Sequence, residues 1–414
     1  MQVIKRDGRK VDFDKDKIKE AVLKAFNEVY PNANKDNTND ANYVCDEVCN
    51  SIDKLNEISV EQIQDVVENI LMGYDTVVAK AYITYRYRHT MARDEYKALM
   101  ADVKEKLSAE NVQNQNANVD EYSFGGRIGE TADIVMKRYA LDYCMSDMAK
   151  NNHLNNEIYI HDLSHYAVGD HNCLSIPFDD LLANGFNTRQ TDVRPAQSVS
   201  TAFQLVAVIF QLQSLQQFGG VSATHLDWTM IPYIRKSFYK HYIDGLKYIE
   251  NVNDYGEMSD DDISDTSIDE DFYKSYTKAY KYAMDMTTKE VYQAVEGLYH
   301  NLNTLQSRSG NQLPFTSINY GTCTLSEGRL VTKALLETSM KGIGKLHKTS
   351  IFPCGIFQCM KGVNRRQGDP NYDLYKLALK STSLRLYPNY ANVDWSGNKG
   401  YDINDPRTFF STMG

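Results

Sequence analysis

Residues 3–13 read Val-Ile-Lys-Arg-Asp-Gly-Arg-Lys-Val-Asp-Phe, two short runs of apolar and charged residues around an Asp-Gly pair. Because Asp-Gly accepts the positive φ of a tight turn, this stretch predicts a β-hairpin. Asp14 then stands at a helix N-cap position. The apolar residues that follow lie on one helical face: Ile18, Val22, Ala25, Phe26 and Val29. The chain is therefore expected to begin with a hairpin that leads into an amphipathic helix.

Working outward, residues 1–95 predict one small module, a β-hairpin plus a helical bundle. Residues 31–42 are rich in Asn and Asp and predict a loop. Ser59-Val60-Glu61-Gln62 is a capping-box pattern, and a helix with a regular apolar face follows it. A Tyr-rich helix, residues 76–91, is expected to complete the bundle.

Residues 96–120 predict a linker, since they are polar and then rich in Asn and Gln. A second domain is expected over residues 121–414, where helical stretches alternate with short apolar runs. The helices are expected at 131–150, 196–218 and 289–307. The strands are expected at 158–160, 315–320 and 350–358. This alternation favours an α/β architecture.

Composition restricts the class of protein. A chain of 414 residues is too long for one ordinary core, and its net charge of −10 argues against a nucleic-acid groove. The longest apolar run, residues 205–210, is too short to cross a membrane, and residues 1–6 lack the apolar stretch of a signal peptide. Seven scattered cysteines without a CxxC pair indicate a reducing cytoplasm and no structural metal site.

The hairpin concentrates positive charge. Its cations are Lys5, Arg6, Arg9 and Lys10, and Lys17 follows near the start of the first helix. Such a cluster can hold a triphosphate or can simply be a solvated basic hairpin. The order of the residues favours the first reading. Val-Ile-Lys-Arg-Asp-Gly followed by Phe13-Asp14-x-x-Lys17-Ile18 resembles the ATP-cone, the regulatory domain of many ribonucleotide reductases, over about residues 1–95.

This resemblance implies a pocket for ATP or dATP as allosteric effectors. By position, the pocket would be lined by Val3, Lys5, Arg6, Lys17 and Ile18. Val60 and Gln64 would flank the base, and Arg88 and His89 on the last helix would reach phosphates. This chain departs from some cones, which carry Thr and His where Val60 and Gln64 stand.

The second domain has its most informative stretch at Ile-Tyr-Ile-His-Asp (158–162), continuing to Asp-His-Asn-Cys-Leu (170–174). Alone, it reads as a strand, a polar turn and a buried cysteine. Further motifs lie before and after this stretch. Along the chain they are Tyr-Ser-Phe-Gly-Gly-Arg (122–127), Gln-Gln-Phe-Gly-Gly (216–220), Ser-Gly-Asn-Gln (309–312), Gly-Ile-Gly-Lys (342–345), Gly-Asp-Pro-Asn-Tyr-Asp (368–373) and Arg-x-Tyr-Pro (385–388). The ordered series resembles the anaerobic (class III, glycyl-radical) ribonucleoside-triphosphate reductases.

That family implies part of a ten-stranded α/β barrel with a finger loop inside, and a reaction that replaces the ribose 2′-hydroxyl with hydrogen. A glycyl radical oxidises one cysteine to a thiyl, and a second cysteine donates hydrogen to the substrate. By position, Cys173 matches the second cysteine. His161 and Asn172 would contact the ribose of a ribonucleoside triphosphate, and Asn311 would lie near the substrate.

The chain ends at Gly414, where the family continues with Cys-Arg-Ser, whose Cys is the thiyl residue. The glycyl radical and zinc are expected only in the missing C-terminal part, so residues 1–414 alone are expected to be inactive. The chain would be a fragment, the product of a broken gene, or half of a split enzyme whose C-terminal half is separately encoded. The resemblance also implies a homodimer and a radical-SAM activating enzyme as partner.

Two other functions stay open. The chain could be a non-catalytic nucleotide-binding regulator that keeps the cone and a decayed barrel, or another glycyl-radical enzyme such as a formate-lyase relative. The cone disfavours the latter, since those enzymes have no need of dATP feedback. Binding of a ribonucleoside triphosphate near Cys173 would separate the reductase from the regulator.

Overall fold

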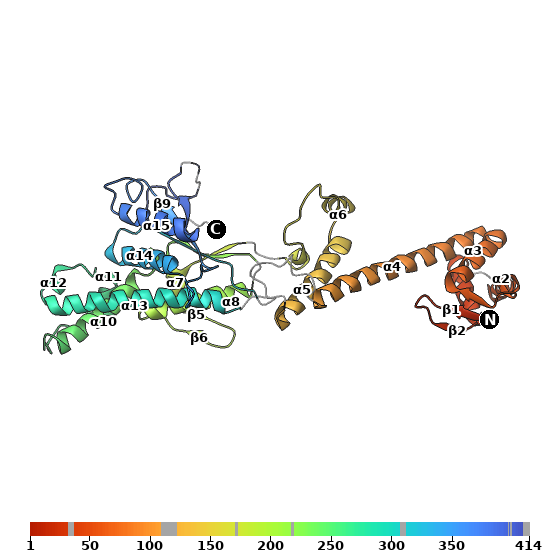
Figure 1. The fold of residues 1–414 in the computed structure, drawn as a ribbon, viewed down its shortest axis with the longest axis horizontal. Helices are drawn as coiled ribbons and strands as arrows, with labels where there is room; N and C mark the ends of the chain where they lie inside the picture. Colours follow the sequence, from red (N-terminus) through yellow and green to blue (C-terminus); the bar gives the residue numbers. More distant parts are fainter. Residues whose placement is uncertain are drawn as a thin grey trace. The chain divides into compact units, whose positions relative to one another are not determined.

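The computed structural model describes residues 1–31, 37–108, 122–169, 173–216, 219–306, 312–395, 397 and 400–408. The chain forms two compact units, Met1–Lys104 and Glu105–Gly414 (Figure 1). Among the described residues, no helix is both long enough and apolar enough to span a membrane.

The first unit is built on a three-stranded sheet in the order β2-β1-β3. Strand β1 (Gln2–Ile4) pairs antiparallel with β2 (Lys10–Asp12) and parallel with β3 (Glu57–Ser59). The turn closes through hydrogen bonds from Lys5 N to Arg9 O (2.8 Å) and from Gly8 N to Lys5 O (2.9 Å). Gly8 adopts φ +82°, the left-handed conformation that glycine accepts without strain. The predicted hairpin is confirmed, whereas the parallel partner β3 was not predicted.

Four helices cover this sheet and enclose one core: α1 (Lys15–Val29), α2 (Asn37–Ile52), α3 (Val60–Tyr74) and α4 (Thr76–Ser108). Asp14 caps α1 by accepting from Asp16 N, and Ser59 and Gln62 form a reciprocal capping box at α3. Both predicted caps are confirmed. They satisfy amide donors that a helix N-terminus otherwise leaves unpaired.

Two predictions for this region need correction. The loop expected at residues 31–42 is wrong from Asn37 onward, because α2 begins there. Its buried face, which includes Val44 and Val48, outweighs the weak helix propensity of Asn and Asp. The helix expected to end at Met91 continues to Ser108, through the first part of the predicted linker 96–120. Residues 109–120 lie outside the described residues.

The second unit contains a five-stranded parallel sheet in the order β10-β9-β8-β7-β4. The strands are β4 (Leu174–Ile176), β7 (Val221–Ala223), β8 (Thr316–Tyr320), β9 (Cys354–Cys359) and β10 (Asn389–Asn392). Parallel strands joined by helical crossovers confirm the α/β architecture. A closed ten-stranded barrel stays a prediction.

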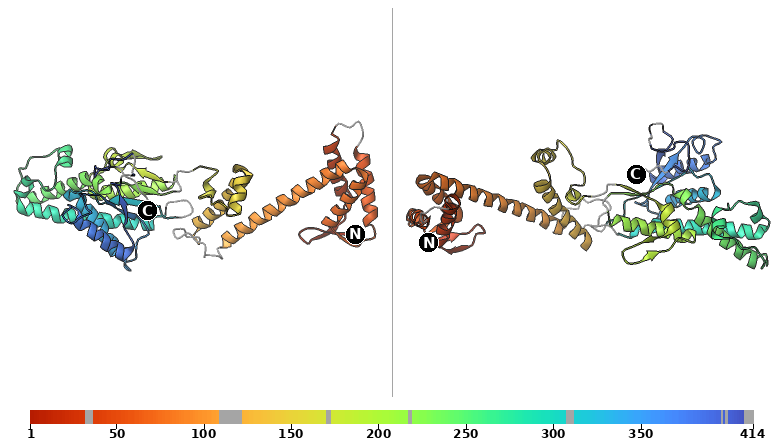
Figure 2. Two further views of the ribbon diagram at one scale, coloured as in Figure 1. Left: turned by 90° about the horizontal axis from the view of Figure 1, so that it is seen from above. Right: turned by 180° about the vertical axis from the view of Figure 1, so that it is seen from behind.

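One face of this sheet packs on helices (Figures 1 and 2). The helices are α8 (Val199–Ser214), α10 (Ile231–Tyr248), α13 (Thr277–Thr304), α14 (Ser326–Lys341) and α15 (Tyr372–Arg385). Ile318, Tyr320 and Phe357 from the sheet join Phe203 and Phe210 of α8 in a single apolar core. Helix α13 begins well before the predicted residue 289.

Helices α10 and α13 approach closely at Gly245. A Cβ atom at that position would lie 2.9 Å from the Cα of Ala279, so only glycine fits without a shift of one helix. The resulting helix pair is extended by a second cluster of aromatic residues around Phe238 and Tyr273. Packing against α10 thus explains why α13 starts at Thr277.

The segment before the sheet holds α5 (Phe124–Tyr139), a π-helical turn (Ala140–Cys144), α6 (Asp147–Leu154) and a 3₁₀ turn (Leu163–His165). The strand expected at 158–160 is wrong. The amides of Glu157 and Ile158 both donate to Asn152 O, at 2.8 and 3.3 Å, so they close the end of α6 and are not available to a sheet. Asn156, with φ +60°, supplies the left-handed residue that ends the helix.

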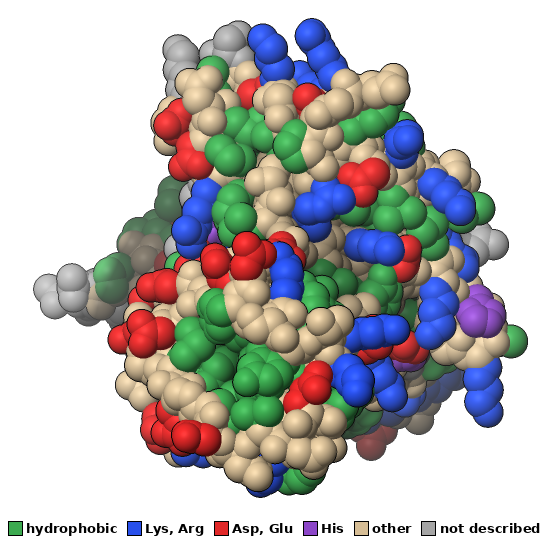
Figure 3. Space-filling model, turned by 90° about the vertical axis from the view of Figure 1, so that its left-hand side faces the viewer, with side chains coloured by type: hydrophobic (Ala, Val, Ile, Leu, Met, Phe, Trp, Pro, Cys, Tyr) green, Lys and Arg blue, Asp and Glu red, His purple; other side chains and the backbone are tan. Residues whose placement is uncertain are grey.

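Shorter elements complete the unit: α7 (Phe178–Asn184), the hairpin β5 (Phe186–Asn187) and β6 (Asp192–Val193), α9 (Leu226–Thr229), α11 (Asp260–Asp265) and α12 (Asp271–Lys274). On the face drawn in Figure 3, acidic side chains gather on the left and basic ones on the right. Charged side chains of the two signs are therefore unevenly distributed over this face.

Candidate functional site

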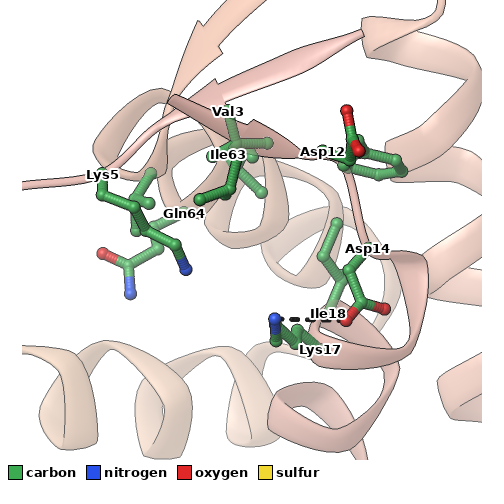
Figure 4. A pocket seen from close by; sticks show the side chains of 11 residues that line it. Val3, Lys5, Asp12, Asp14, Lys17, Ile18, Ile63 and Gln64 are labelled. Atoms are coloured by element: carbon green, nitrogen blue, oxygen red, sulfur yellow. Dashed lines mark ion pairs between the residues drawn. The ribbon is translucent and has the colours of Figure 1, made fainter. Parts of the chain in front are cut away.

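A cavity of about 180 Å³ lies in the first unit, between the hairpin and the first turns of α1 and α3 (Figure 4). Its walls are Val3, Lys5, Val11, Asp12, Phe13, Asp14, Lys17, Ile18, Val60, Ile63 and Gln64. The parallel pairing of β1 with β3 creates this arrangement. Because α3 begins directly after β3, the first turn of α3 lies beside the hairpin.

Apolar side chains form one wall of the cavity. Val3 on β1, Ile18 on α1 and Ile63 on α3 are each buried, with less than a tenth of their surface exposed. The flat ring face of a nucleobase can lie against such a surface and gain from its removal from water.

Two ammonium groups point into the cavity from opposite ends, those of Lys5 and Lys17 (Figure 4). The ammonium of Lys17 lies 3.2 Å from a carboxylate oxygen of Asp14, and this hydrogen bond lowers the pKa of Asp14. Asp14 also caps α1, so the pair stands at a helix N-terminus. Cations beside a helix N-terminus favour an anionic ligand such as phosphate.

Beside the cavity lies an ionic network that joins the hairpin, α3 and α4. Its members are Arg6, Glu61, Gln64, Asp65, Glu68 and Arg86, and we call it the Arg6–Arg86 network.

Arg6 forms the hairpin end of this network. Arg6 Nη2 donates to Gln64 Oε1 at 2.9 Å, and Arg6 Nε pairs with Glu61. The hydrogen bond from Arg6 lowers the pKa of Glu61.

Arg86 forms the α4 end. Its guanidinium reaches Glu61 (2.9 Å), Asp65 (2.7 Å) and Glu68 (2.8 Å), and its side chain is 19% exposed. These three carboxylates follow one stripe of α3, because residues spaced by four and three positions share a helix face.

Six of the nine residues predicted for the effector pocket line this cavity: Val3, Lys5, Lys17, Ile18, Val60 and Gln64. Arg6 is not among the described residues that line the cavity, but it donates a hydrogen bond to Gln64, which does line it. Arg88 and His89 are exposed on α4 and are not among the described residues that line the cavity; the ring of His89 lies against Tyr85, with 4.2 Å between centroids. Nucleotide binding by all nine residues stays a prediction.

Sequence reasoning missed Glu61 and Arg86. The spacing of Glu61, Asp65 and Glu68 in the sequence already indicates that their carboxylates share one face of α3. The choice between Arg86 and Arg88, however, depends on the rotation of α4 about its axis, which buried Val78 and Tyr82 determine.

In the second unit, Cys173 is exposed and directly precedes β4. Ser175 of β4 is in register with Ser222 of β7, and Ser222 with Ser317 of β8. Because in-register residues of parallel strands point to the same side, these serines form a row on one face of the sheet. Cys173 stands two residues before Ser175, just outside β4, and the same alternation, continued by one residue beyond the strand, would place it on that face.

Buried amides extend this row. Asn319 Nδ2 donates to Ser222 Oγ at 3.0 Å, and Gln358 Nε2 donates to the Thr224 carbonyl at 3.1 Å. The face formed by Ser175, Ser222, Ser317, Asn319 and Gln358, which we call the polar sheet face, lies opposite the apolar face that packs on the helices. Sequence reasoning missed it, because each strand carries only one or two of these residues.

The structure gives less support to the other residues that were predicted to contact the substrate. His161 lies before the 3₁₀ turn with its side chain 76% exposed, and its Nδ1 is 2.6 Å from Asp162. Asn172 and Asn311 lie outside the described residues. Within the described ranges, no group of three or more His, Cys, Asp or Glu side chains could hold a metal ion.

Known protein families match both parts of the chain. The family model described as "Anaerobic ribonucleoside-triphosphate reductase" matches residues 115–412, and that of the "ATP cone domain" matches residues 1–91. The anaerobic ribonucleoside-triphosphate reductase of Haemophilus influenzae is 32% identical over 401 residues, which are 95% of this chain and 52% of the relative. The Escherichia coli protein of the same name is 32% identical over 399 residues, 95% of this chain and 51% of the relative.

The chain thus spans about half the length of the curated relatives it matches. A solved anaerobic ribonucleotide reductase from Thermotoga maritima, in complex with dATP and CTP, is 14% identical with a TM-score of 0.44, covering 72% of this chain and 49% of that chain. The match of the reductase family over residues 115–412 includes most of the chain. By this family-model match, the chain belongs to the anaerobic ribonucleoside-triphosphate reductase family.

Proposed function

We propose that this chain supplies the effector-binding cone and the Cys173-bearing part of an enzyme that reduces ribonucleoside triphosphates to 2′-deoxyribonucleoside triphosphates by radical chemistry without oxygen. ATP and dATP would act as allosteric effectors at the cone. The observation that carries the proposal is the cavity between the hairpin, α1 and α3, where six residues of the expected pocket meet.

The walls of the cavity suit an adenine nucleotide. The apolar wall around Val3 and Ile18 matches a base, and the ammonium groups of Lys5 and Lys17 match phosphates. An incoming phosphate, which carries more charge than a carboxylate, can replace Asp14 as the partner of Lys17. The cavity therefore offers an apolar surface and cations at separate places, as a nucleotide requires.

For catalysis, the support comes from the position of Cys173 at the start of β4, beside the row of Ser175, Ser222 and Ser317. Hydroxyl and amide groups on this face can hold the hydroxyls of a ribose while the thiol approaches the sugar. The glycyl radical would supply the oxidising equivalent, and zinc the structural metal, in the portion of the relatives beyond this match. A homodimer, a radical-SAM activating enzyme and a cytoplasmic location belong to the same proposal.

The lysines of the cavity give a direct test. Replacing Lys5 or Lys17 by methionine is expected to weaken ATP binding to the chain by roughly 10- to 100-fold, since a hydrogen bond to a charged group contributes about 1.5–3 kcal/mol. Titration calorimetry of the 414-residue chain with ATP measures this effect.

Lys10→Met serves as the matched control. Lys10 lies on the same hairpin, pairs with Glu57 at 2.5 Å and is not among the described residues that line the cavity. Its loss is expected to change ATP affinity less than twofold. Equal losses for Lys10 and Lys5 would show that only the overall charge of the hairpin matters, and the proposed pocket would then be wrong.

A further inference from the structure

Two of the seven cysteines lie one turn apart on the same helix. Cys45 and Cys49 both belong to α2 and are four positions apart, so their side chains share one face of that helix. Cys45 is fully buried in the core of the first unit, whereas Cys49 is partly buried at the edge of this core. One thiol is thus enclosed, and solvent reaches the other in part.

A cation lies beside these thiols. Cys45 Sγ donates to the carbonyl of Lys15 at 3.6 Å. The pKa of Lys15 is raised, chiefly by its hydrogen bond to Asp46 and also by the two cysteines, so its ammonium is close to both thiols. Burial, and then Cys49, raises the pKa of the Cys45 thiol to about 11, so this thiol keeps its proton at neutral pH.

The geometry of the helix disfavours a disulfide between the two cysteines. Residues four positions apart on a helix have Cβ atoms about 5–6 Å apart, whereas a disulfide requires about 3.5–4.5 Å. An ion held between the two sulfurs adds two bonds of about 2.3 Å, the length of a zinc–thiolate bond, and so spans up to about 4.6 Å between the sulfur atoms. The spacing is therefore too long for an S–S bond and matches a bridging ion.

The number of ligands decides which ion this is. Structural zinc takes four ligands, and among the described residues no group of three or more His, Cys, Asp or Glu side chains could hold a metal ion. Cu(I) prefers thiolates to oxygen donors and forms stable complexes with only two of them. It is also the form in which copper occurs under reducing conditions.

We propose that Cys45 and Cys49 form a two-thiolate site for Cu(I). The ion enters from the side of Cys49 and displaces the proton of each thiol, so that two S–H bonds break, two S–Cu bonds form and two protons are released. The complex has one negative charge in excess, which the ammonium of Lys15 offsets. None of the three residues is among the described residues that line the nucleotide cavity, so the site is independent of the proposed function.

Copper binding is measured without oxygen, with Cu(I) as the probe and the coloured chelator bicinchoninate as its competitor. The reference is the 414-residue chain with Cys144→Ser and Cys173→Ser, which removes the two exposed thiols. It is expected to bind one equivalent of Cu(I), and X-ray absorption at the copper edge should show two sulfur neighbours. Cys49→Ser should weaken binding by roughly 100-fold or more, since one of the two metal–sulfur bonds is lost.

Two further variants refine the test. Lys15→Met should weaken binding by roughly two- to fivefold, the scale of an exposed ion pair. Cys359→Ala is the matched control, because Cys359 is also buried but lies on β9 in the second unit. It should bind Cu(I) as the reference does. Copper binding that Cys49→Ser leaves unchanged, or copper neighbours other than two sulfurs, would overturn the site.

Oxidation tests the spacing separately. Diamide converts neighbouring thiols into disulfides, and it should leave Cys45 and Cys49 reduced in the folded reference chain. Mass spectrometry of its peptides identifies the state of each cysteine. A disulfide between Cys45 and Cys49 would show that the two sulfurs approach more closely than the helix spacing allows, and the bridging ion would then lose its geometric basis.

Discussion

Replacing Cys173 by serine in the complete reductase is expected to lower the rate of deoxyribonucleotide formation by roughly 1000-fold or more, the scale seen when a group that acts chemically is removed. A thiol gives up a hydrogen atom far more readily than an alcohol, because its S–H bond is weaker than an O–H bond. Serine keeps the shape of the side chain and replaces only the thiol by a hydroxyl. The loss would therefore report the chemistry of Cys173 and not a change of shape.

Two measurements accompany this variant. ATP affinity should be unchanged, since the cavity proposed to bind the effector belongs to the other compact unit. Cys144→Ser is the matched control, because Cys144 is also exposed but stands in the π-helical turn after α5. It should retain full activity. Deoxyribonucleotide formation that survived the change at Cys173 would remove that residue from the mechanism.

The buried ion pair between Arg235 and Glu327 gives the second large expected effect. Arg235 Nε lies 2.7 Å from Glu327 Oε1, and the carboxylate side chain is fully buried. The same oxygen accepts from Ile268 N at 3.2 Å, and Arg235 Nη1 donates to the Ser264 carbonyl at 2.9 Å. Arg235→Met leaves this carboxylate buried without its cation, and is expected to lower the free energy of unfolding by about 3–5 kcal/mol.

Urea unfolding followed by tryptophan fluorescence measures this loss, since the only two tryptophans, Trp228 and Trp395, both belong to the second unit. Lys274→Met is the control. Its pair with Asp271 is exposed, so its removal should cost less than about 1 kcal/mol. Adding Glu327→Gln to Arg235→Met should recover part of the stability, because it removes the unpaired charge. If Arg235→Met and Lys274→Met lowered the free energy of unfolding by similar amounts, burial of the Arg235–Glu327 pair would not be the cause of the loss.

Features with a local cause were predicted well from the sequence. The hairpin depends on Gly8 and its turn, and the caps at Asp14 and Ser59 depend on residues within one helical turn. The errors occur where distant contacts decide. Asn37 to Ala41 become helical because α2 covers the core, and Ile158 is drawn into the end of α6 by a carbonyl of that helix.

The candidate sites show the same difference between local patterns, which the sequence reveals, and contacts between distant residues, which it does not. The order of motifs indicated the cone pocket, and the cavity indeed gathers Lys5, Lys17 and Gln64. It could not indicate that Arg6 faces Glu61, because their contact spans 55 positions and depends on β1 pairing with β3. The polar sheet face was equally hidden, since its row of serines exists only once the register of three strands is fixed.

The parallel order of the sheet also has a consequence for how the chain acquires its structure during synthesis. Ser222 pairs with Ser317, which follows 317 − 222 = 95 positions later, and the edge strand β10 ends only at Asn392. Pairings between such distant segments form slowly, and domains fold from the N-terminus as the chain emerges at about 5–20 residues per second. The cone, whose core is complete within the first 104 residues, should thus be able to bind its effector while the sheet that carries Cys173 is still being assembled.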